Sequence, residues 1–150
     1  MKVLKDFLSN KDIMSLAVIS QDLPWVATLF FAEDENLNLI FISGKGTQHS
    51  KAIENDDSVA VSIYDHSSDP EGKKIGVQIS GKCHKITNPL EIKSAYTTFR
   101  KKFPDTKVKL TDILETAFRS AFYKVEVEYV KYFNSELDPK IQEFSLRNLP

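Results

Sequence analysis

The 150-residue sequence contains a single cysteine, Cys83, and its apolar runs stay well short of the ~20 residues that span a bilayer. One cysteine excludes an internal disulfide and a cysteine-based zinc cluster, and it fits a reducing compartment. Residues 1–10 include Lys2, Lys5 and Asp6 and have no long apolar run, so we do not expect a signal peptide there. These features predict a cytoplasmic protein.

Neither sign of charge dominates the chain. It has 20 Lys and Arg against 21 Asp and Glu, a formal net charge of -1, so an electrostatic footprint for nucleic acid is not expected. Hydrophobic residues make up 41% and charged residues 27%, as in ordinary globular proteins, and the length allows a sizeable core. Since no repeat, low-complexity tract or linker divides the sequence, we expect residues 1–150 to form one domain.

Short apolar runs between polar turns predict a mainly β fold. The predicted strands are residues 15–20, 25–32, 37–42, 58–64, 73–86 and 123–133. The polar loop at residues 33–36 predicts an antiparallel hairpin between the second and third strands. The first three strands are apolar on both faces, which favours a barrel or a sheet that is covered on both sides. In the last strand, the alternation of apolar and polar residues shifts by one position at Val130, which predicts a bulge.

Helical patterns flank these strands. A short amphipathic helix is expected near the N-terminus, a second helix over residues 111–118, and an extended arm over residues 137–149. The strongest helix signal is Asn88-Pro89 with Glu91, which combines an N-cap, a first-turn proline and a capping-box acid. One apolar stripe follows, which we interpret as packing against the sheet rather than as a cofactor site. Its members are Ile92, Ala95, Tyr96, Phe99 and Phe103.

The stretch from residue 41 to residue 51 (FISGKGTQHSK) carries the main functional signal. A buried strand ends in two glycines, which relieve the φ restriction and allow a close approach, and Thr47 can then cap a short helix. The free N–H groups at such a helix start, together with the helix dipole, suit a phosphate. Charge is added by Lys45, Lys51 and His49, hydroxyl groups by Thr47 and Ser50, and no acidic residue lies between Ser43 and Lys51.

Alternatives remain for these patterns. A glycine turn before a capped helix is common, and neither the nucleotide P-loop spacing nor the dinucleotide fingerprint is present, because His49 stands where the latter needs a glycine. Residues 65–72 hold three carboxylates and a histidine, but a loop without a regular frame favours solvation over a metal site. The small, polar face formed by Gly76, Gln78 and Ser80 suits either a bound ligand or plain solvent exposure.

Several segments, taken in order, resemble the pyridoxamine 5'-phosphate oxidase-like family, the FMN-binding split barrels. They are residues 16–20 (LAVIS), 24–31 (PWVATLFF) and 39–43 (LIFIS), followed by 47–51 (TQHSK). The resemblance covers roughly residues 15–133 and extends to a small branch whose third strand ends in Thr-x-His. It implies a mainly β, six-stranded antiparallel split barrel with helices, and a homodimer that holds FMN between its subunits.

The resemblance also implies which residues hold FMN. The strand matching residues 26–30 lies along the flavin ring in this family, the segment matching residues 43–51 holds the ring edge, ribityl chain and phosphate, and the position matching Gln78 approaches the flavin. The expected cofactor-binding residues are Ala27, Thr28, Leu29, Ile42, Ser43, Lys45, Thr47, His49, Ser50, Lys51 and Gln78. His49 stands where the family usually has a basic residue, so phosphate affinity would be lower or pH-dependent.

The expected activity is flavin-dependent oxidation or reduction of a small molecule, with a nicotinamide or similar donor, and no catalytic side chain is identified. Pyridoxamine phosphate oxidation itself is not expected, because we find no counterparts to the arginines and histidine that bind the vitamin phosphate. A flavin- or haem-holding sensor or carrier is the alternative, with His49, His66 and His84 as the only histidines. A barrel without cofactor would be an interaction domain. No metal, nucleic-acid or membrane partner is expected.

Overall fold

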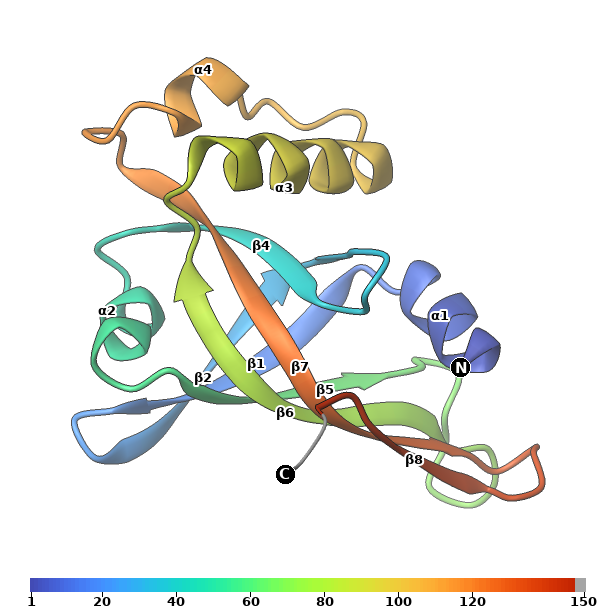
Figure 1. Cartoon of the computed structure of the whole chain (residues 1–150). Coiled ribbons are helices and arrows are strands. Elements are labelled where there is room, and N and C mark those ends of the chain that lie inside the picture. Colours follow the sequence, from blue (N-terminus) through green and yellow to red (C-terminus); the bar gives the residue numbers. More distant parts are fainter. Residues whose placement is uncertain (148–150) are drawn as a thin grey trace.

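The computed structural model describes residues 1–147, and within them eight strands form one antiparallel sheet (Figure 1). The strand order is β2-β1-β5-β6-β7-β4-β3, with β8 added beside β7. The sheet curls into a half-barrel, with α3 and α4 above one end and α2 and α1 on opposite sides (Figure 1). In chain order the elements are α1 (Lys2–Ser9), β1 (Ile13–Ser20), β2 (Leu23–Phe30), β3 (Ala32–Glu33), β4 (Leu39–Gly44), α2 (Gln48–Asn55), β5 (Ser58–Tyr64), β6 (Ile75–Lys85), α3 (Pro89–Lys102), α4 (Leu110–Ile113), β7 (Ser120–Asn134) and β8 (Ile141–Ser145).

The expected mainly β split barrel is confirmed, but the described residues hold eight strands rather than six. The six expected strands correspond to β1, β2, β4, β5, β6 and β7. The short β3 is an extra strand that follows β2 after Phe31, and β8 is the expected C-terminal arm, which pairs with β7 from Phe133↔Ile141 to Tyr129↔Ser145. The end of that predicted arm, at Leu149, lies outside the described residues.

The expected hairpin between the second and third strands is wrong for most of its length. Only Ala32 and Glu33 pair with β4, whereas β2 pairs with β1 along its whole length, from Ile13↔Phe30 to Ser20↔Leu23. A two-residue turn closes that hairpin, with positive φ at Gln21 (51°) and Asp22 (64°), which matches the right-handed twist of the strands. As a result β2 is an edge strand and is largely exposed.

Two apolar clusters hold the fold together. One fills the inside of the curled sheet, where the ring of Phe41 stacks on Tyr123 with 5.2 Å between centroids, and α1 contributes Leu4, Phe7 and Leu8. The other lies between the sheet and α3, where Ile92, Ala95 and Phe99 pack against residues that include Phe122, with Tyr96 and Phe103 partly buried beside them. The predicted apolar stripe is therefore a packing face, as expected.

The helix ends agree with the sequence only in part. Asn88 caps α3, since its Oδ1 accepts from the main-chain N–H of Leu90 (2.9 Å). Glu91 does not complete a capping box, because its carboxylate instead accepts from Lys124 Nζ at 2.8 Å. The second predicted helix ends at Ile113, and the chain beyond it continues as turns. Within residues 1–147, none of the helices is both long enough and apolar enough to cross a membrane.

The predicted bulge in the last long strand is confirmed. Ser80 pairs with Tyr129 and Gly81 pairs with Val127, which leaves Glu128 as the extra residue of β7. Gly81 is required here, because a Cβ at this position would lie 2.2 Å from the carbonyl oxygen of Glu126. The bulge lets residues on both sides of it point into the same core.

Candidate functional site

The site predicted from the sequence begins where β4 ends at Gly44 and α2 starts at Gln48. Thr47 is the N-cap of α2, and its Oγ1 accepts from the main-chain N–H of Ser50 at 3.2 Å, as the sequence predicts. The expectation that the glycines relieve φ is wrong, because no glycine among the described residues has a positive φ. Gly46 has open space where a side chain would lie, so this turn leaves room for an approaching group.

A polar cluster lies against this turn. Ser43 Oγ is 2.6 Å from His49 Nε2, and Thr47 Oγ1 is 3.2 Å from the same nitrogen. Thr47 Oγ1 also lies 2.8 Å from Ser50 Oγ and 3.0 Å from the carbonyl oxygen of Gly44. Burial lowers the pKa of His49, which favours the neutral ring near pH 7, and a neutral ring nitrogen can accept a hydrogen bond from the Ser43 hydroxyl. The structure thus brings four of the predicted residues together.

Several main-chain donors at the start of α2 are unpaired. Within the part of the chain that the structure describes, the N–H groups of Gly46, Gln48 and His49 have no hydrogen-bond acceptor. Helix-start N–H groups carry partial positive charge, and together with the dipole they form a ready anion site. This arrangement suits an anion such as a phosphate.

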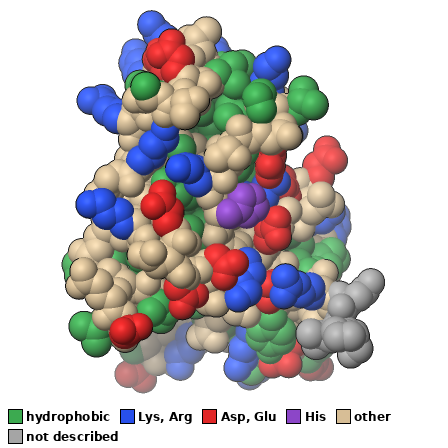
Figure 2. All heavy atoms as spheres, turned by 60° about the vertical axis from the view of Figure 1, so that its left-hand side comes forward, with side chains coloured by type: hydrophobic (Ala, Val, Ile, Leu, Met, Phe, Trp, Pro, Cys, Tyr) green, Lys and Arg blue, Asp and Glu red, His purple; other side chains and the backbone are tan. Residues whose placement is uncertain are grey.

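The two predicted lysines differ in their surroundings. Lys45 turns toward the loop before β7, where its Nζ donates to the carbonyl oxygen of Thr116 at 2.8 Å, while Lys51 is exposed on α2. The same loop brings Arg119 beside the turn, because the N–H of Lys45 donates to the Arg119 carbonyl at 2.8 Å. Figure 2 shows this side of the molecule, where Lys and Arg side chains gather at the upper left.

Arg119 is a candidate that sequence reasoning missed. It directly precedes β7, in which Ala121 is buried and pairs with Ser43. Since side chains alternate along a strand, Arg119 continues the face of Ala121 and so lies on the side of the polar cluster. No local signal marks this residue, because only the pairing of β7 with β4 brings it to the glycine turn.

The other predicted residues lie elsewhere. Ala27 and Leu29 pair with the inward-facing Leu16 and Met14, whereas Thr28 faces outward opposite Ser15. The side chain of Ile42 packs in the cluster beneath α3, away from Ser43. Gln78 lies on the outward face, in one row across the sheet that runs Thr28–Ser15–Ser62–Gln78. Within one chain, Gln78 is therefore separated from the turn at residues 43–51.

The remaining histidines and the acidic loop form no common centre. His66 is exposed, and His84 lies between Glu91 (3.7 Å) and Glu126 (3.9 Å) on opposite sides of its ring. Across residues 1–147, no group of three or more His, Cys, Asp or Glu side chains is arranged to hold a metal ion. In the loop at residues 65–72, Asp65 and Asp69 accept hydrogen bonds that close turns, and these bonds lower the pKa of both carboxyls.

Comparisons with known proteins agree with the fold and the sequence. A UPF0306 protein of Pasteurella multocida is 27% identical over 139 residues, which cover 91% of this chain and 85% of that protein. Campylobacter jejuni ChuZ shares the fold with a TM-score of 0.75 at 11% identity, over 96% of this chain and 58% of that one. A heme binding protein from Mycobacterium smegmatis has a TM-score of 0.68 at 11% identity, over 92% and 54% of the two chains.

The family match covers most of the sequence. Residues 1–134 match the family described as pyridoxamine 5'-phosphate oxidase. This range includes α1 through β7, and hence the whole curled sheet apart from β8. The chain belongs to the pyridoxamine 5'-phosphate oxidase family.

Proposed function

We propose that this protein is an FMN-binding flavoprotein that oxidises or reduces a small molecule. The observation that carries the proposal is the set of unpaired N–H groups at Gly46, Gln48 and His49, next to the hydroxyls of Thr47 and Ser43. We assign to Lys51 and Arg119 the role of balancing a phosphate dianion there, and membership of the family supports the same group. When bound, FMN supplies the electron-transfer chemistry, while the protein supplies orientation and electrostatics.

The edge strand β2 offers a complementary site for the flavin ring. Because the N–H of Phe31 donates to the carbonyl of Asp12, alternation along the strand directs the main-chain groups of Leu29 and Ala27 toward β1. The main-chain groups of Thr28 and Val26 then face the open edge, where β2 pairs with no other strand of residues 1–147. Free strand-edge amides can pair with the polar edge of a flavin.

The role of His49 in this proposal is structural and electrostatic. A neutral imidazole that accepts from Ser43 orients that hydroxyl and leaves the phosphate charge to be balanced by Lys51 and Arg119. No side chain in the cluster is placed as an acid or base for a substrate. We therefore assign the redox step to the cofactor, with a nicotinamide or similar reductant as the donor.

We further propose a homodimer and a cytoplasmic location. Thr28 and Gln78 face outward, so they can contact a flavin only if it is held against that face, between two subunits. Exposed apolar side chains on β2, namely Leu23, Trp25, Val26 and Phe30, provide surface for a second copy. Burial raises the pKa of the Cys83 thiol to about 12, which keeps the one cysteine inert and fits a reducing environment.

Titration of FMN and riboflavin, followed by quenching of flavin fluorescence, tests the phosphate site. A hydrogen bond to a charged group contributes roughly 1.5–3 kcal/mol, which is about 10- to 150-fold in affinity. Lys51→Ala and Arg119→Gln should each weaken FMN within that range and leave riboflavin almost unchanged, and Thr47→Val should weaken FMN more mildly. Lys140→Ala, in an exposed turn remote in sequence, is the control. Equal losses of affinity for FMN and riboflavin would mean that these residues do not contact the phosphate.

A haem-holding sensor or carrier is the second candidate. The specific observation in its favour is that solved structures with this fold include a heme binding protein and a heme storage protein, HutZ of Vibrio cholerae, with a TM-score of 0.67. An absorption spectrum of the purified protein separates the two candidates, since haem gives a Soret band and a flavin does not. Binding of haem without binding of either flavin would replace the flavoprotein proposal.

A further inference from the structure

The hydroxyl of Tyr123 is a polar group in the interior of the half-barrel that lacks a hydrogen bond. The side chain is fully buried, and within residues 1–147 its hydroxyl has no hydrogen-bond partner. Tyr123 pairs with Phe41 across β7 and β4, and the two rings stack at 5.2 Å with 12° between their planes. An unpaired buried hydroxyl destabilises the folded state, and phenylalanine would fill the same space without that cost. Packing alone therefore gives no reason for a tyrosine here.

This hydroxyl lies on the side of the polar cluster at the start of α2. Since side chains alternate along a strand, Tyr123 shares the face of Ala121, which pairs with Ser43. Burial raises the pKa of Tyr123, and the neighbouring hydroxyl of Ser50 acts against this rise. Ser50 is itself fully buried, and its Oγ lies 2.8 Å from Thr47 Oγ1. Three hydroxyls therefore run from the core to the helix start, in the order Tyr123, Ser50, Thr47.

Thr47 has one hydroxyl proton and three acceptors within reach. They are the carbonyl oxygen of Gly44 at 3.0 Å, Ser50 Oγ at 2.8 Å and His49 Nε2 at 3.2 Å. A phosphate on the unpaired N–H groups of the helix start would be a fourth acceptor, and hydrogen bonds to a charged acceptor are roughly twice as strong as neutral ones. The Thr47 proton would then turn to the phosphate, and the buried oxygen of Ser50 would lose its donor.

We propose that Tyr123 is a positioning residue for phosphate binding, because its hydroxyl donates to Ser50 Oγ when Thr47 donates to the ligand. This inference rests on the phosphate site of the proposed function. Ser50 then donates to Thr47 Oγ1, so the three hydroxyls form one chain in which every proton points toward the anion. Each hydroxyl keeps its own proton and changes only its direction. Hydrogen bonds that are ordered in this way polarise one another and strengthen the bond to the ligand.

Tyr123→Phe should have two effects of opposite direction. Without ligand, the variant loses only an unpaired hydroxyl, so the urea midpoint of unfolding should stay the same or rise. With ligand, the last donor of the chain is missing, so affinity for FMN should fall about threefold to tenfold, while affinity for riboflavin, which has no phosphate, should stay unchanged. Urea unfolding and quenching of flavin fluorescence measure the two effects. A lower midpoint, or equal losses for both flavins, would overturn the inference.

Tyr132→Phe is the matched control on the same strand. Tyr132 is also buried, but its hydroxyl accepts from Asn134 Nδ2 at 3.1 Å. Loss of this bond should lower the urea midpoint and leave the binding of both flavins unchanged.

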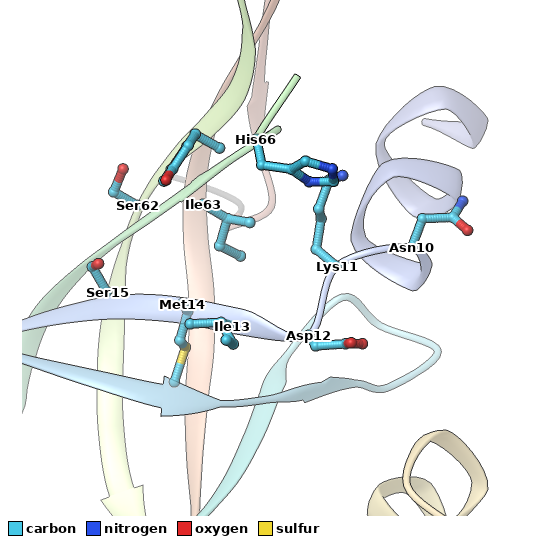
Figure 3. A pocket seen from close by; sticks show the side chains of 10 residues that line it. Asn10, Lys11, Asp12, Ile13, Met14, Ser15, Ser62, Ile63 and His66 are labelled. Carbon is cyan, nitrogen blue, oxygen red and sulfur yellow. The ribbon is translucent and has the colours of Figure 1, made fainter. Parts of the chain in front are cut away.

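Ser62→Leu provides the pattern expected of a contact with the flavin ring. Ser62 lines a cavity of about 350 Å³ between β1 and β5 and pairs with Gln78, on the outward face that we assign to the ring (Figure 3). The added bulk should weaken FMN and riboflavin alike, in contrast to the loss for FMN alone that we expect of Tyr123→Phe.

A double-mutant cycle with Ser50→Ala tests the chain itself. Ser50→Ala removes the link between Tyr123 and Thr47, so adding Tyr123→Phe should weaken FMN no further, and additive losses would overturn the chain. If the wild type prefers FMN to riboflavin and Tyr123→Phe keeps that preference in full, this inference alone is wrong. If the wild type binds the two flavins equally, or binds neither, the phosphate site of the proposed function is wrong and the inference fails with it.

Discussion

Ser43 Oγ lies 2.6 Å from Nε2 of His49, at the point where β4 gives way to α2. A hydroxyl that donates to this nitrogen stabilises the neutral ring, and burial of His49 acts in the same direction by lowering its pKa. The sequence suggested that His49 adds positive charge to a phosphate site. The structure instead places His49 in a hydroxyl cluster that favours its neutral ring. In our proposal the positive charge therefore comes from Lys51, Arg119 and the start of α2.

The first prediction concerns the titration of His49. Its pKa, measured from imidazole NMR signals, should lie below the usual value of about 6.5, and Ser43→Ala should raise it by removing the donor to Nε2. The unfolded chain takes up this proton at higher pH than the folded protein does. The free energy of unfolding should therefore decrease as pH falls through about 6.5, and the decrease should be complete below the folded pKa.

Urea unfolding at about pH 7.5 and about pH 5.5 measures this decrease, with His49→Gln as the reference because it has no titrating ring. The difference in stability between the two pH values should be larger for the wild type than for His49→Gln. A difference of the same size in both proteins would mean that other groups cause the pH dependence.

The second prediction compares two glycines. Gly81→Ala would place a Cβ 2.2 Å from the main-chain oxygen of Glu126 at the bulge, so the backbone must shift, and we expect a loss of about 3 kcal/mol or more. Gly46→Ala meets nothing within 4 Å and has no positive φ, so it should be neutral or stabilise by up to about 1 kcal/mol. Denaturant unfolding measures both. If Gly81→Ala loses only a little stability, the backbone at the bulge can relax to make room for the added Cβ.

Much of the fold could be predicted because its signals are local. The alternation in β7, the phase change at Val130 and the N-cap at Asn88 each depend on a few neighbouring residues, and each agrees with the structure. The partner of β2 could not be predicted, since apolar residues on both faces suit a buried strand as well as an exposed edge. The two-residue turn at Gln21–Asp22 is the signal that would have identified the β1–β2 hairpin.

The candidate site could be predicted only where its residues lie close together in the sequence. Residues 43–50 follow one another in the chain, so their grouping around a helix start was open to sequence reasoning. The position of Arg119 beside this turn depends on strand register over a long sequence separation. Such pairings are decided by the packing of the whole sheet, and no local pattern encodes them.

The third prediction concerns the face of α3. Phe99 is 8% exposed and its ring lies 4.9 Å from that of Phe103 and 5.9 Å from that of Phe122, between centroids. Phe99→Ala should cost about 3–5 kcal/mol by removing these contacts and leaving a cavity. Thermal unfolding measures the loss, with Lys93→Ala on the exposed face of the same helix as the control. If both variants lower the midpoint temperature of unfolding equally, the packing of α3 on the sheet does not depend on its apolar stripe.

The last prediction concerns assembly. Val26 is 60% exposed and Phe30 is 59% exposed on the edge strand β2, an amount of open apolar surface that favours a second copy. Light scattering at micromolar concentration should give twice the chain mass of 17.1 kDa. Val26→Glu should shift the equilibrium toward monomer, because it places a charge in the apolar contact. Leu90→Glu is the matched control, since Leu90 is 76% exposed at the start of α3. This variant should remain dimeric. A wild-type monomer with FMN present would exclude a flavin shared between subunits.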